Sequence, residues 1–311
     1  MSAVALAVTS PVLEATALTR HFPLQTGVSL RRRPLLRAVH EVDLALRAGT
    51  VTALVGESGS GKSTVARLLA LLDRPTAGAI RYADADASRL WRRRDVLRYR
   101  SQVQLIFQDP FASLNPAKRV EHHLARPLRI HRIVPRKLVR MRVHELLESV
   151  GLVPAEEFAG KYPHELSGGQ RQRVAIARAL AVEPKVLLAD EPISMLDVSI
   201  RAGILNLMLD LKEQRDIAFL YITHDLTSAR YVADEVLVML SGRIVERGPT
   251  DDVLHDPMHP YTQLLLSAVP DPESGARERP LLIRPDLRNL DADAPLVEAK
   301  PGHWVRMEVT R

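Results

Sequence analysis

The chain has 311 residues, 46% of them hydrophobic, a formal net charge of +6 and no cysteine. Its length and apolar content suit one large α/β domain with an appendage. The lack of cysteine excludes disulfides, thiolate metal sites and cysteine-bound iron–sulfur clusters.

No apolar stretch approaches the ~18 residues that a membrane-spanning helix needs. Met1–Pro11 lacks a basic region followed by an apolar one, so we expect no secretory signal. A basic chain suits nucleic acid or an anionic membrane surface as partner. Here, however, the charge is spread out, and we expect the short runs Arg31–Arg33 and Arg92–Arg94 on solvated loops.

The first 50 residues predict an antiparallel subdomain. Leu13–Leu18 and Val39–Leu46 are short strand candidates, separated by a loop rich in Gly, Pro and Arg. Alternation at Val42, Leu44 and Leu46 is typical of a half-buried strand.

A glycine-rich run between a predicted strand and a predicted helix is the most informative motif. The apolar segment Val51–Val55 predicts the strand, and Val65, Leu68, Leu69 and Leu72 recur at helical spacing after it. The run fits the phosphate-binding pattern Gly-x4-Gly-Lys-Ser/Thr. Its residues are Gly56, Glu57, Ser58, Gly59, Ser60, Gly61, Lys62, Ser63 and Thr64.

This arrangement predicts a nucleotide-binding site. Glycines let backbone N–H groups converge on phosphate oxygens, and the positive end of the helix dipole points at the same anion. Lys62 can reach the β- and γ-phosphates, and the Ser63 hydroxyl can ligate Mg2+.

Residues 111–165 read as helical, without a strong strand signal. Val139, Val143, Leu146 and Val150 form one helical face that Gly151 ends. A helical insertion of this kind inside an α/β domain is expected to form a subdomain.

Strand and helix signals alternate again after the helical segment. Val186–Ala189 and Ile217–Thr223 predict buried strands, and the apolar face of a helix lies between them. This alternation predicts a mostly parallel sheet covered by helices. Val236–Leu240 and Arg243–Val245 read as a hairpin. Beyond Pro270 the chain predicts a small appendage or a partly disordered tail.

Two carboxylates follow one of the predicted core strands. In open parallel sheets ligands gather at the carboxyl ends of strands, so Asp190 is expected near the phosphate loop, where it can hold Mg2+. Glu191 is one residue further and can polarise an attacking water. The other interpretation is a solvated acidic pair that caps the helix predicted at Val198–Lys212.

Two further polar residues end apolar segments. His224 follows the strand Ile217–Thr223, where an imidazole can contact the γ-phosphate or hold a neighbouring carboxylate. Gln108 follows the apolar segment Val103–Phe107, and its amide can coordinate Mg2+ or position water. By itself the Gln108 signal is weak, and a lone histidine is more often a helix cap or a satisfied polar residue than a site residue.

A second anion-binding helix start lies at Ser167, Gly168, Gly169 and Gln170, where a hydroxyl and two glycines expose backbone N–H groups. One chain thus carries two phosphate grips. Either the helical subdomain folds back onto the phosphate loop of its own chain, or the grips of two chains close over each nucleotide.

The order of these motifs resembles the ATP-binding subunits of ATP-binding cassette (ABC) transporters. The likeness covers about residues 12–270, and the run Leu166–Gln170 is nearly diagnostic of that family. It implies a P-loop NTPase (ABC-type) core with a mostly parallel sheet, an antiparallel N-terminal β subdomain and a helical insertion. The domain boundaries that it implies are 12–250 for the ATP-binding domain, with the helical subdomain at about 111–180, and 251–311 for a C-terminal extension.

The resemblance also assigns roles to residues. By position it implies that Phe22 stacks on adenine, although Phe22 could equally be a core residue. It implies that Glu191, His224 and Gln108 act in catalysis, and that Ser63, Gln108 and Asp190 hold Mg2+. The signature Ser167–Gln170 would act on the ATP of a partner chain. Asp197 would belong to the D-loop, the segment that follows the Walker B pair Asp190 and Glu191.

A narrower resemblance points to the oligopeptide and dipeptide importers. It rests on Phe107–Pro116 around Gln108 and on His259-Pro260-Tyr261-Thr262, although the latter could be a plain surface helix. Similar subunits serve nickel, glutathione, opine and oligosaccharide uptake.

The resemblance implies an ATPase at the cytoplasmic face of the cell membrane. Its implied partners are transmembrane permease subunits, a second ATP-binding subunit, identical or different, and indirectly an extracytoplasmic solute-binding protein. An exporter ATPase is the nearer alternative. A DNA-repair ATPase of the ABC type is the more distant one, because such proteins carry a long coiled coil or zinc-binding cysteines, and we expect no nucleic-acid partner.

Overall fold

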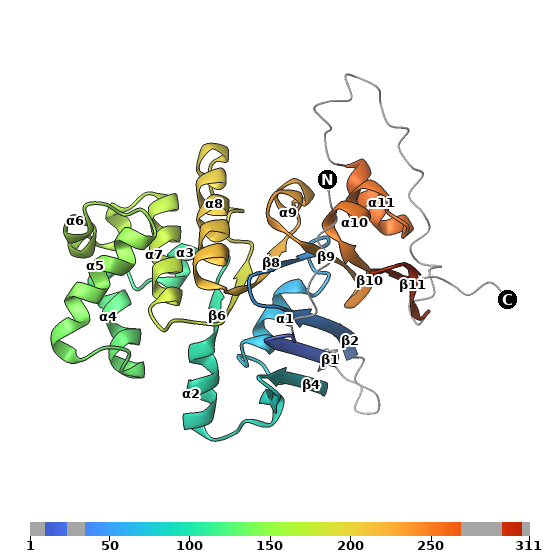
Figure 1. The fold of residues 1–311 in the computed structure, drawn as a ribbon, viewed down its shortest axis with the longest axis horizontal. Helices are drawn as coiled ribbons and strands as arrows, with labels where there is room; N and C mark the ends of the chain where they lie inside the picture. The colour runs from blue at the N-terminus through green and yellow to red at the C-terminus, as the bar shows by residue number, and fades with distance from the viewer. Residues whose placement is uncertain (1–9, 24–34, 269–293, 307–311) are drawn as a thin grey trace, which may run out of the picture.

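The computed structural model describes residues 10–23, 35–268 and 294–306. These residues form a large sheet in the strand order β11-β12-β10-β9-β3-β8-β7-β6 and a smaller sheet in the order β2-β1-β4-β5 (Figure 1). The strands are β1 (Leu13–Pro23), β2 (Leu35–Leu46), β3 (Val51–Val55), β4 (Ala77–Tyr82), β5 (Ala85–Asp86), β6 (Val103–Ile106), β7 (Val186–Asp190), β8 (Ala218–Thr223), β9 (Glu235–Leu240), β10 (Arg243–Pro249), β11 (Leu296–Lys300) and β12 (His303–Arg306).

The helices separate into those that cover the sheets and those that form a group of their own. They are α1 (Lys62–Leu69), α2 (Arg93–Gln102), α3 (Pro110–Ser113), α4 (Val120–His131), α5 (Val139–Ser149), α6 (Ala155–Gly160), α7 (Gly168–Leu180), α8 (Val198–Arg215), α9 (Leu226–Val232), α10 (Thr250–His255) and α11 (Pro260–Ser267). None of the helices within the described ranges combines the length and hydropathy that a membrane crossing requires.

The centre of the large sheet is parallel. Strand β3 pairs in parallel with β8 and β9, and β7 pairs in parallel with β6 and β8. The expected mostly parallel α/β core is therefore confirmed over β6, β7, β8, β3 and β9. Antiparallel pairing of β10, β12 and β11 extends it at one edge.

Both faces of this sheet are buried, because apolar residues occupy successive positions of its strands. In β8, Phe219 and Tyr221 belong to the core cluster that also contains the helical subdomain and α8. Leu220 and Ile222 belong to the cluster on the other face, with α1 and the N-terminal sheet. A strand that is apolar on both sides is stable only as an interior strand, which accounts for the central place of β8.

The N-terminal sheet is antiparallel, as the alternation in residues 39–46 predicts. Strands β1 and β2 pair from Leu13 opposite Leu46 to Pro23 opposite Leu35. Both strands are longer than the sequence suggests. The loop between them lies outside the described residues, and so does Arg31–Arg33. Arg93 and Arg94 begin helix α2 instead of lying on a loop, although both are exposed as expected.

The helices α3 to α7 form the subdomain at one end of the molecule, and α10, α11 and the β11–β12 hairpin lie at the other end (Figure 1). Residues 269–293 of the segment expected to be a small appendage or a partly disordered tail lie outside the described residues. Residues 296–306 belong to the segment that was expected to be a small appendage or a partly disordered tail, and they form a hairpin whose β12 strand pairs with β10. Pairing with the sheet edge stabilises segments that are too short to show a strand pattern of their own.

Candidate functional site

The loop between β3 and α1 packs so closely against the rest of the domain that two of its positions require glycine. A Cβ atom on Gly56 would lie 2.2 Å from the carbonyl oxygen of Met239, and one on Gly61 would lie 2.1 Å from that of Ala38. Both glycines also have positive φ angles, 152° and 109°. The motif therefore adopts a fixed loop conformation that an L side chain at either position would disrupt.

Lys62 is the first residue of α1, and only 5% of its surface is exposed. Its Nζ atom donates hydrogen bonds to the carbonyl oxygens of Gly56 and Glu57, each at 2.7 Å, and lies 3.4 Å from the Ser60 hydroxyl. Burial lowers the pKa of the Lys62 ammonium, and the nearby carboxylates of Glu191, Asp190 and Glu57 oppose that shift. The ammonium is thus held inside the loop by neutral oxygens.

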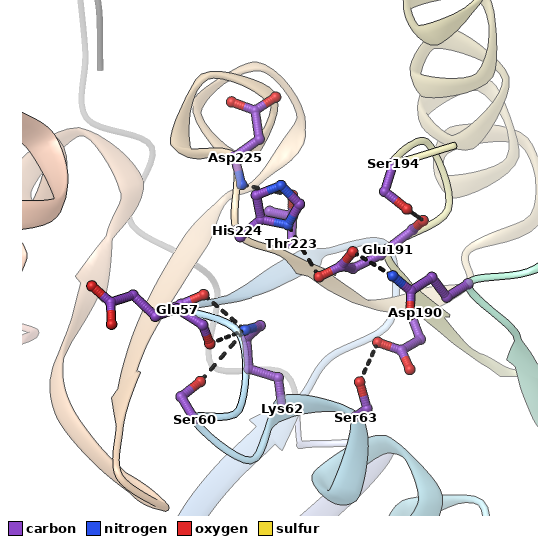
Figure 2. Close-up of polar contacts among 12 residues, drawn as sticks. Glu57, Ser60, Lys62, Ser63, Asp190, Glu191, Ser194, Thr223, His224 and Asp225 are labelled. Atoms are coloured by element: carbon purple, nitrogen blue, oxygen red, sulfur yellow. Dashed lines mark hydrogen bonds and ion pairs between the residues drawn. The ribbon is translucent and has the colours of Figure 1, made fainter. Parts of the chain in front are cut away.

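Asp190 ends strand β7 directly beside the start of α1. The hydroxyl of Ser63 donates a hydrogen bond to Oδ1 of Asp190 at 3.0 Å, and Figure 2 shows the two side chains facing each other. Burial raises the pKa of Asp190, and the hydrogen bond from Ser63 opposes that shift. A hydroxyl and a carboxylate from different elements therefore meet at the position that the sequence predicts.

The carboxylate of Glu191 is contacted from two sides. Gln108 donates from Nε2 to one carboxylate oxygen at 2.9 Å, and Nδ1 of His224 lies 3.1 Å from the other (Figure 2). The Glu191 backbone has a φ angle of 45°, and its N–H donates to the carbonyl of Ile222 on β8 at 2.9 Å. A left-handed non-glycine residue that the neighbouring strand fixes in place is typical of functional sites.

A pocket of about 490 Å³ opens over the loop. The sequence-predicted residues that line it include Phe22, Lys62, Ser63, Gln108 and Glu191. The sequence reasoning missed five other lining residues, which come from β2 and from the β9–β10 turn. These are Leu36, Arg37, Ala38, Ser241 and Gly242.

Most of the missed residues carry no sequence signal, because they reach the pocket only through the packing of one sheet on the other. The N–H of Gly242 donates to the carbonyl of Ser60 at 2.9 Å, and the N–H of His40 donates to the carbonyl of Gly242 at 2.8 Å. The sequence does mark Ser241-Gly242, but only as a turn and not as part of a nucleotide site.

The second predicted phosphate grip lies elsewhere in this chain. Ser167 caps helix α7: its hydroxyl accepts from the N–H of Gln170 at 3.3 Å, and the Gln170 side chain accepts from the N–H of Ser167 at 2.9 Å. Ser167 is exposed, and residues 167–170 are not among those that line the pocket. Asp197, which precedes α8, is exposed as well. The structure thus brings the loop, Asp190, Glu191, Gln108 and His224 together, but not residues 167–170.

Comparison with known proteins agrees with this geometry. Residues 39–194 match the ABC transporter family, and residues 245–292 match the oligopeptide/dipeptide transporter C-terminal region. The chain is 47% identical over 262 residues to the di/tripeptide transport ATP-binding protein DppF of Pseudomonas aeruginosa, covering 83% of this chain and 79% of DppF. It is 42% identical over 302 residues to the oligopeptide transport ATP-binding protein OppF of Bacillus subtilis, covering 96% of both.

Solved structures show the same fold. A dimeric ATP-binding cassette, MJ0796, in a post-hydrolysis state bound to ADP and Pi, has a TM-score of 0.66 and 28% identity, over 76% of this chain and 98% of that one. The structure of cbiO1 from Clostridium perfringens has a TM-score of 0.67 and 27% identity, over 80% and 92%. The chain therefore belongs to the ABC transporter family, as an ATP-hydrolysing subunit.

Proposed function

We propose that this subunit powers an importer of peptides or similar small solutes. The match of residues 245–292 to the oligopeptide/dipeptide transporter C-terminal region carries this proposal. The names of the relatives support it, since several are dipeptide or oligopeptide transport proteins. The glutathione import ATP-binding protein GsiA of Escherichia coli is 44% identical to this chain over 304 residues. A glutathione-like solute is therefore the second candidate.

In the proposed mechanism Lys62 binds the β- and γ-phosphates of ATP. Its charge is available to them, because its present partners are the neutral oxygens of Gly56, Glu57 and Ser60. Buried charge-assisted hydrogen bonds to phosphate are strong, so we expect Lys62 to supply much of the affinity. Phe22 and Arg37 line the same pocket, and we assign the adenine contact to Phe22.

Mg2+ fits the donors on the other side of the loop. Ser63, Asp190 and Gln108 offer hydroxyl, carboxylate and amide oxygens, the ligand types that Mg2+ prefers. The described part of the chain has no group of three or more His, Cys, Asp or Glu side chains that could hold a metal alone. The ion would therefore depend on phosphate oxygens as further ligands. When bound, it would neutralise charge on the phosphates.

Glu191 is assigned as the general base. Glu191 lines the same pocket as Ser63, Lys62 and Gln108, where its carboxylate can accept a proton from a water that attacks the γ-phosphate. The contacts from Gln108 and His224 hold both carboxylate oxygens in place. The second phosphate grip, Ser167–Gln170, is assigned to the ATP of a partner subunit. The dimeric form of MJ0796 supports that assignment.

Two permease subunits, a second ATP-binding subunit and an extracytoplasmic solute-binding protein complete the proposed system. The subunit would bind the permeases from the cytoplasmic face of the membrane, as a peripheral protein.

The test is reconstitution of the full complex, purified through this subunit, in proteoliposomes. We expect ATP hydrolysis and uptake to be stimulated by the binding protein loaded with di- or tripeptides. Matched reactions contain glutathione, an oligosaccharide or Ni2+ as the solute. Stimulation by one of those solutes instead would overturn the peptide assignment and leave the ATPase assignment intact. ATP-driven export would overturn import itself.

A further inference from the structure

One peptide unit of the phosphate loop is held from both sides. The carbonyl of Gly56 accepts from Nζ of Lys62 at 2.7 Å, and the N–H of Glu57 donates to the hydroxyl of Tyr261 at 2.9 Å. These two groups belong to the same trans peptide bond, so they point in opposite directions. The orientation of this peptide is therefore fixed by Lys62 on one side and by Tyr261 on the other.

Tyr261 reaches the loop from the C-terminal extension, 204 residues away along the chain. It lies in the first turn of α11 and is completely buried. It does not line the nucleotide pocket, so its hydroxyl acts on the loop backbone from behind. Burial raises the pKa of Tyr261, so the group that accepts this hydrogen bond at neutral pH is the neutral hydroxyl.

The segment that carries Tyr261 is firmly anchored to the large sheet. Glu246 on β10 is completely buried, and its carboxylate accepts from the N–H groups of Met258 at 2.7 Å and His259 at 3.1 Å. Nε2 of the buried His303 on β12 lies 2.8 Å from the same carboxylate. Nδ1 of His259 accepts from the N–H of Tyr261 at 3.1 Å and so caps α11. These contacts fix the start of α11, and with it the Tyr261 hydroxyl.

The hydrogen bond to Tyr261 also strengthens the contact on the other side of the peptide. Donation by the N–H polarises the peptide unit and makes its carbonyl a better acceptor. That carbonyl is one of the oxygens that solvate the buried ammonium of Lys62. Without the Tyr261 hydroxyl the Glu57 N–H would lose its partner, and the peptide would turn to find another one.

We propose that Tyr261 is a positioning residue for nucleotide binding, which sets the orientation of the Gly56–Glu57 peptide and through it the position of Lys62. The C-terminal extension thereby supports the phosphate loop from outside the pocket. This inference rests on the proposed role of Lys62 in binding phosphate.

The test compares Tyr261→Phe with Thr262→Val in the full chain. Phenylalanine keeps the buried ring and removes only the hydroxyl. The matched control removes the neighbouring buried hydroxyl, which has no hydrogen-bond partner among the residues that the structure describes. We expect Tyr261→Phe to weaken MgATP binding by calorimetry about five-fold, as the loss of one hydrogen bond predicts. Thr262→Val should bind MgATP like the wild type.

A readout specific to positioning is the split between KM and kcat in the reconstituted complex. Tyr261→Phe should raise the KM for ATP about five-fold and leave kcat within about two-fold, because Glu191 and its partners are untouched. Thr262→Val should leave both constants near the wild-type values. A Tyr261→Phe chain that loses kcat but keeps the wild-type KM for ATP would overturn the inference.

Hydrogen exchange of the wild-type chain gives a second measurement that does not depend on folding of the variant. The Glu57 amide should be protected without nucleotide, and Tyr261→Phe, but not Thr262→Val, should remove that protection. An unprotected Glu57 amide in the wild type would contradict the proposal. If Lys62→Ala leaves MgATP affinity unchanged, the proposed function of Lys62 fails. If Lys62→Ala abolishes binding while Tyr261→Phe matches the wild type, only the present inference fails.

Discussion

Nδ1 of His224 and Oε1 of Glu191 lie 3.1 Å apart, although the two residues directly follow different strands, β8 and β7. The contact exists because β7 and β8 are adjacent and parallel, so that their carboxyl ends meet at one edge. Glu191 is mostly buried, with 14% of its side chain exposed, whereas 58% of the His224 side chain is exposed. The histidine therefore covers the Glu191 carboxylate from the solvent side.

Glu191→Gln should retain MgATP binding and reduce turnover about 100-fold or more, because the amide is nearly isosteric but cannot take a proton from water. The measurement is ATP hydrolysis by the reconstituted complex, with binding followed separately by calorimetry. Glu213→Gln makes the same charge change at an exposed position of α8 and should leave hydrolysis unchanged. Hydrolysis near the wild-type rate in Glu191→Gln would exclude Glu191 as the base.

His224→Ala should spare ATP binding and slow hydrolysis about 100-fold, because the Glu191 carboxylate loses one of its two side-chain partners. Asparagine can place an amide group near the position of Nδ1, so His224→Asn should restore part of the rate if that contact is what matters. Equal rates in the two variants would show that positioning by Nδ1 is not the function of His224.

The strands and the phosphate loop could be predicted from the sequence because their signals are local. Val51–Val55 is a strand with the bounds that its apolar run predicts, and the motif after it has the expected strand–loop–helix context. The contacts between Ser63 and Asp190 and between Glu191 and His224 follow from the parallel sheet that the alternation of elements predicts.

What the sequence could not supply depends on packing between distant segments. Arg37 enters the pocket because β2 docks against the loop, and nothing in its neighbourhood marks it as a site residue. Tyr261 was visible as part of a family-like segment, but its contact with Glu57 depends on the buried Glu246 that ties α11 to the sheet. The β11–β12 hairpin was missed because its order comes from pairing with β10.

Gly61→Ala and Gly59→Ala should differ in stability although both residues have positive φ angles. A Cβ on Gly61 would lie 2.1 Å from the carbonyl oxygen of Ala38, whereas a Cβ on Gly59 meets nothing within 4 Å. Both substitutions incur the left-handed strain of roughly 1–2 kcal/mol, but only Gly61→Ala adds a backbone clash. Urea unfolding without nucleotide should therefore give a clearly lower midpoint for Gly61→Ala. Similar midpoints would contradict the loop geometry.

The His259 cap predicts a pH dependence of stability. Burial lowers the pKa of His259, Glu246 on β10 opposes that shift, and Arg306 on β12 adds to it. In the unfolded chain His259 therefore binds a proton near its ordinary pKa of about 6.5. In the folded chain it binds that proton only at lower pH. The free energy of unfolding should fall as pH drops below that value, by at most about 1.4 kcal/mol per pH unit for this group.

Asparagine is a good helix cap that does not titrate, so His259→Asn should show a smaller loss of stability between pH 7 and pH 5.5 than the wild type. The difference between the two chains isolates His259, because other histidines with lowered pKa values, such as His123, are present in both. Identical pH dependence in urea unfolding would contradict the prediction.

The proposed composite site predicts a specific pattern of complementation. Gly168→Asp adds bulk and negative charge at the start of α7, so it should spare ATP binding by the single chain and block closure of a dimer around the γ-phosphate. Lys62→Ala should instead abolish binding at its own loop. In a mixed dimer of these two variants one site carries both lesions and the other carries neither. Some hydrolysis should therefore return on mixing.

Neither variant alone should show that recovery, and mixing either variant with itself is the matched control. The rate should rise with the fraction of mixed dimers, which cross-linking between differently tagged chains can measure. The test assumes that a dimer with one intact site can hydrolyse ATP. If mixed dimers then form and no hydrolysis returns, the site is built within one chain. If the natural partner is a different subunit, the same logic applies with Gly168→Asp in this chain and the lysine substitution in the phosphate loop of the partner. The intact site is then the one that combines the phosphate loop of this chain with the signature of the partner.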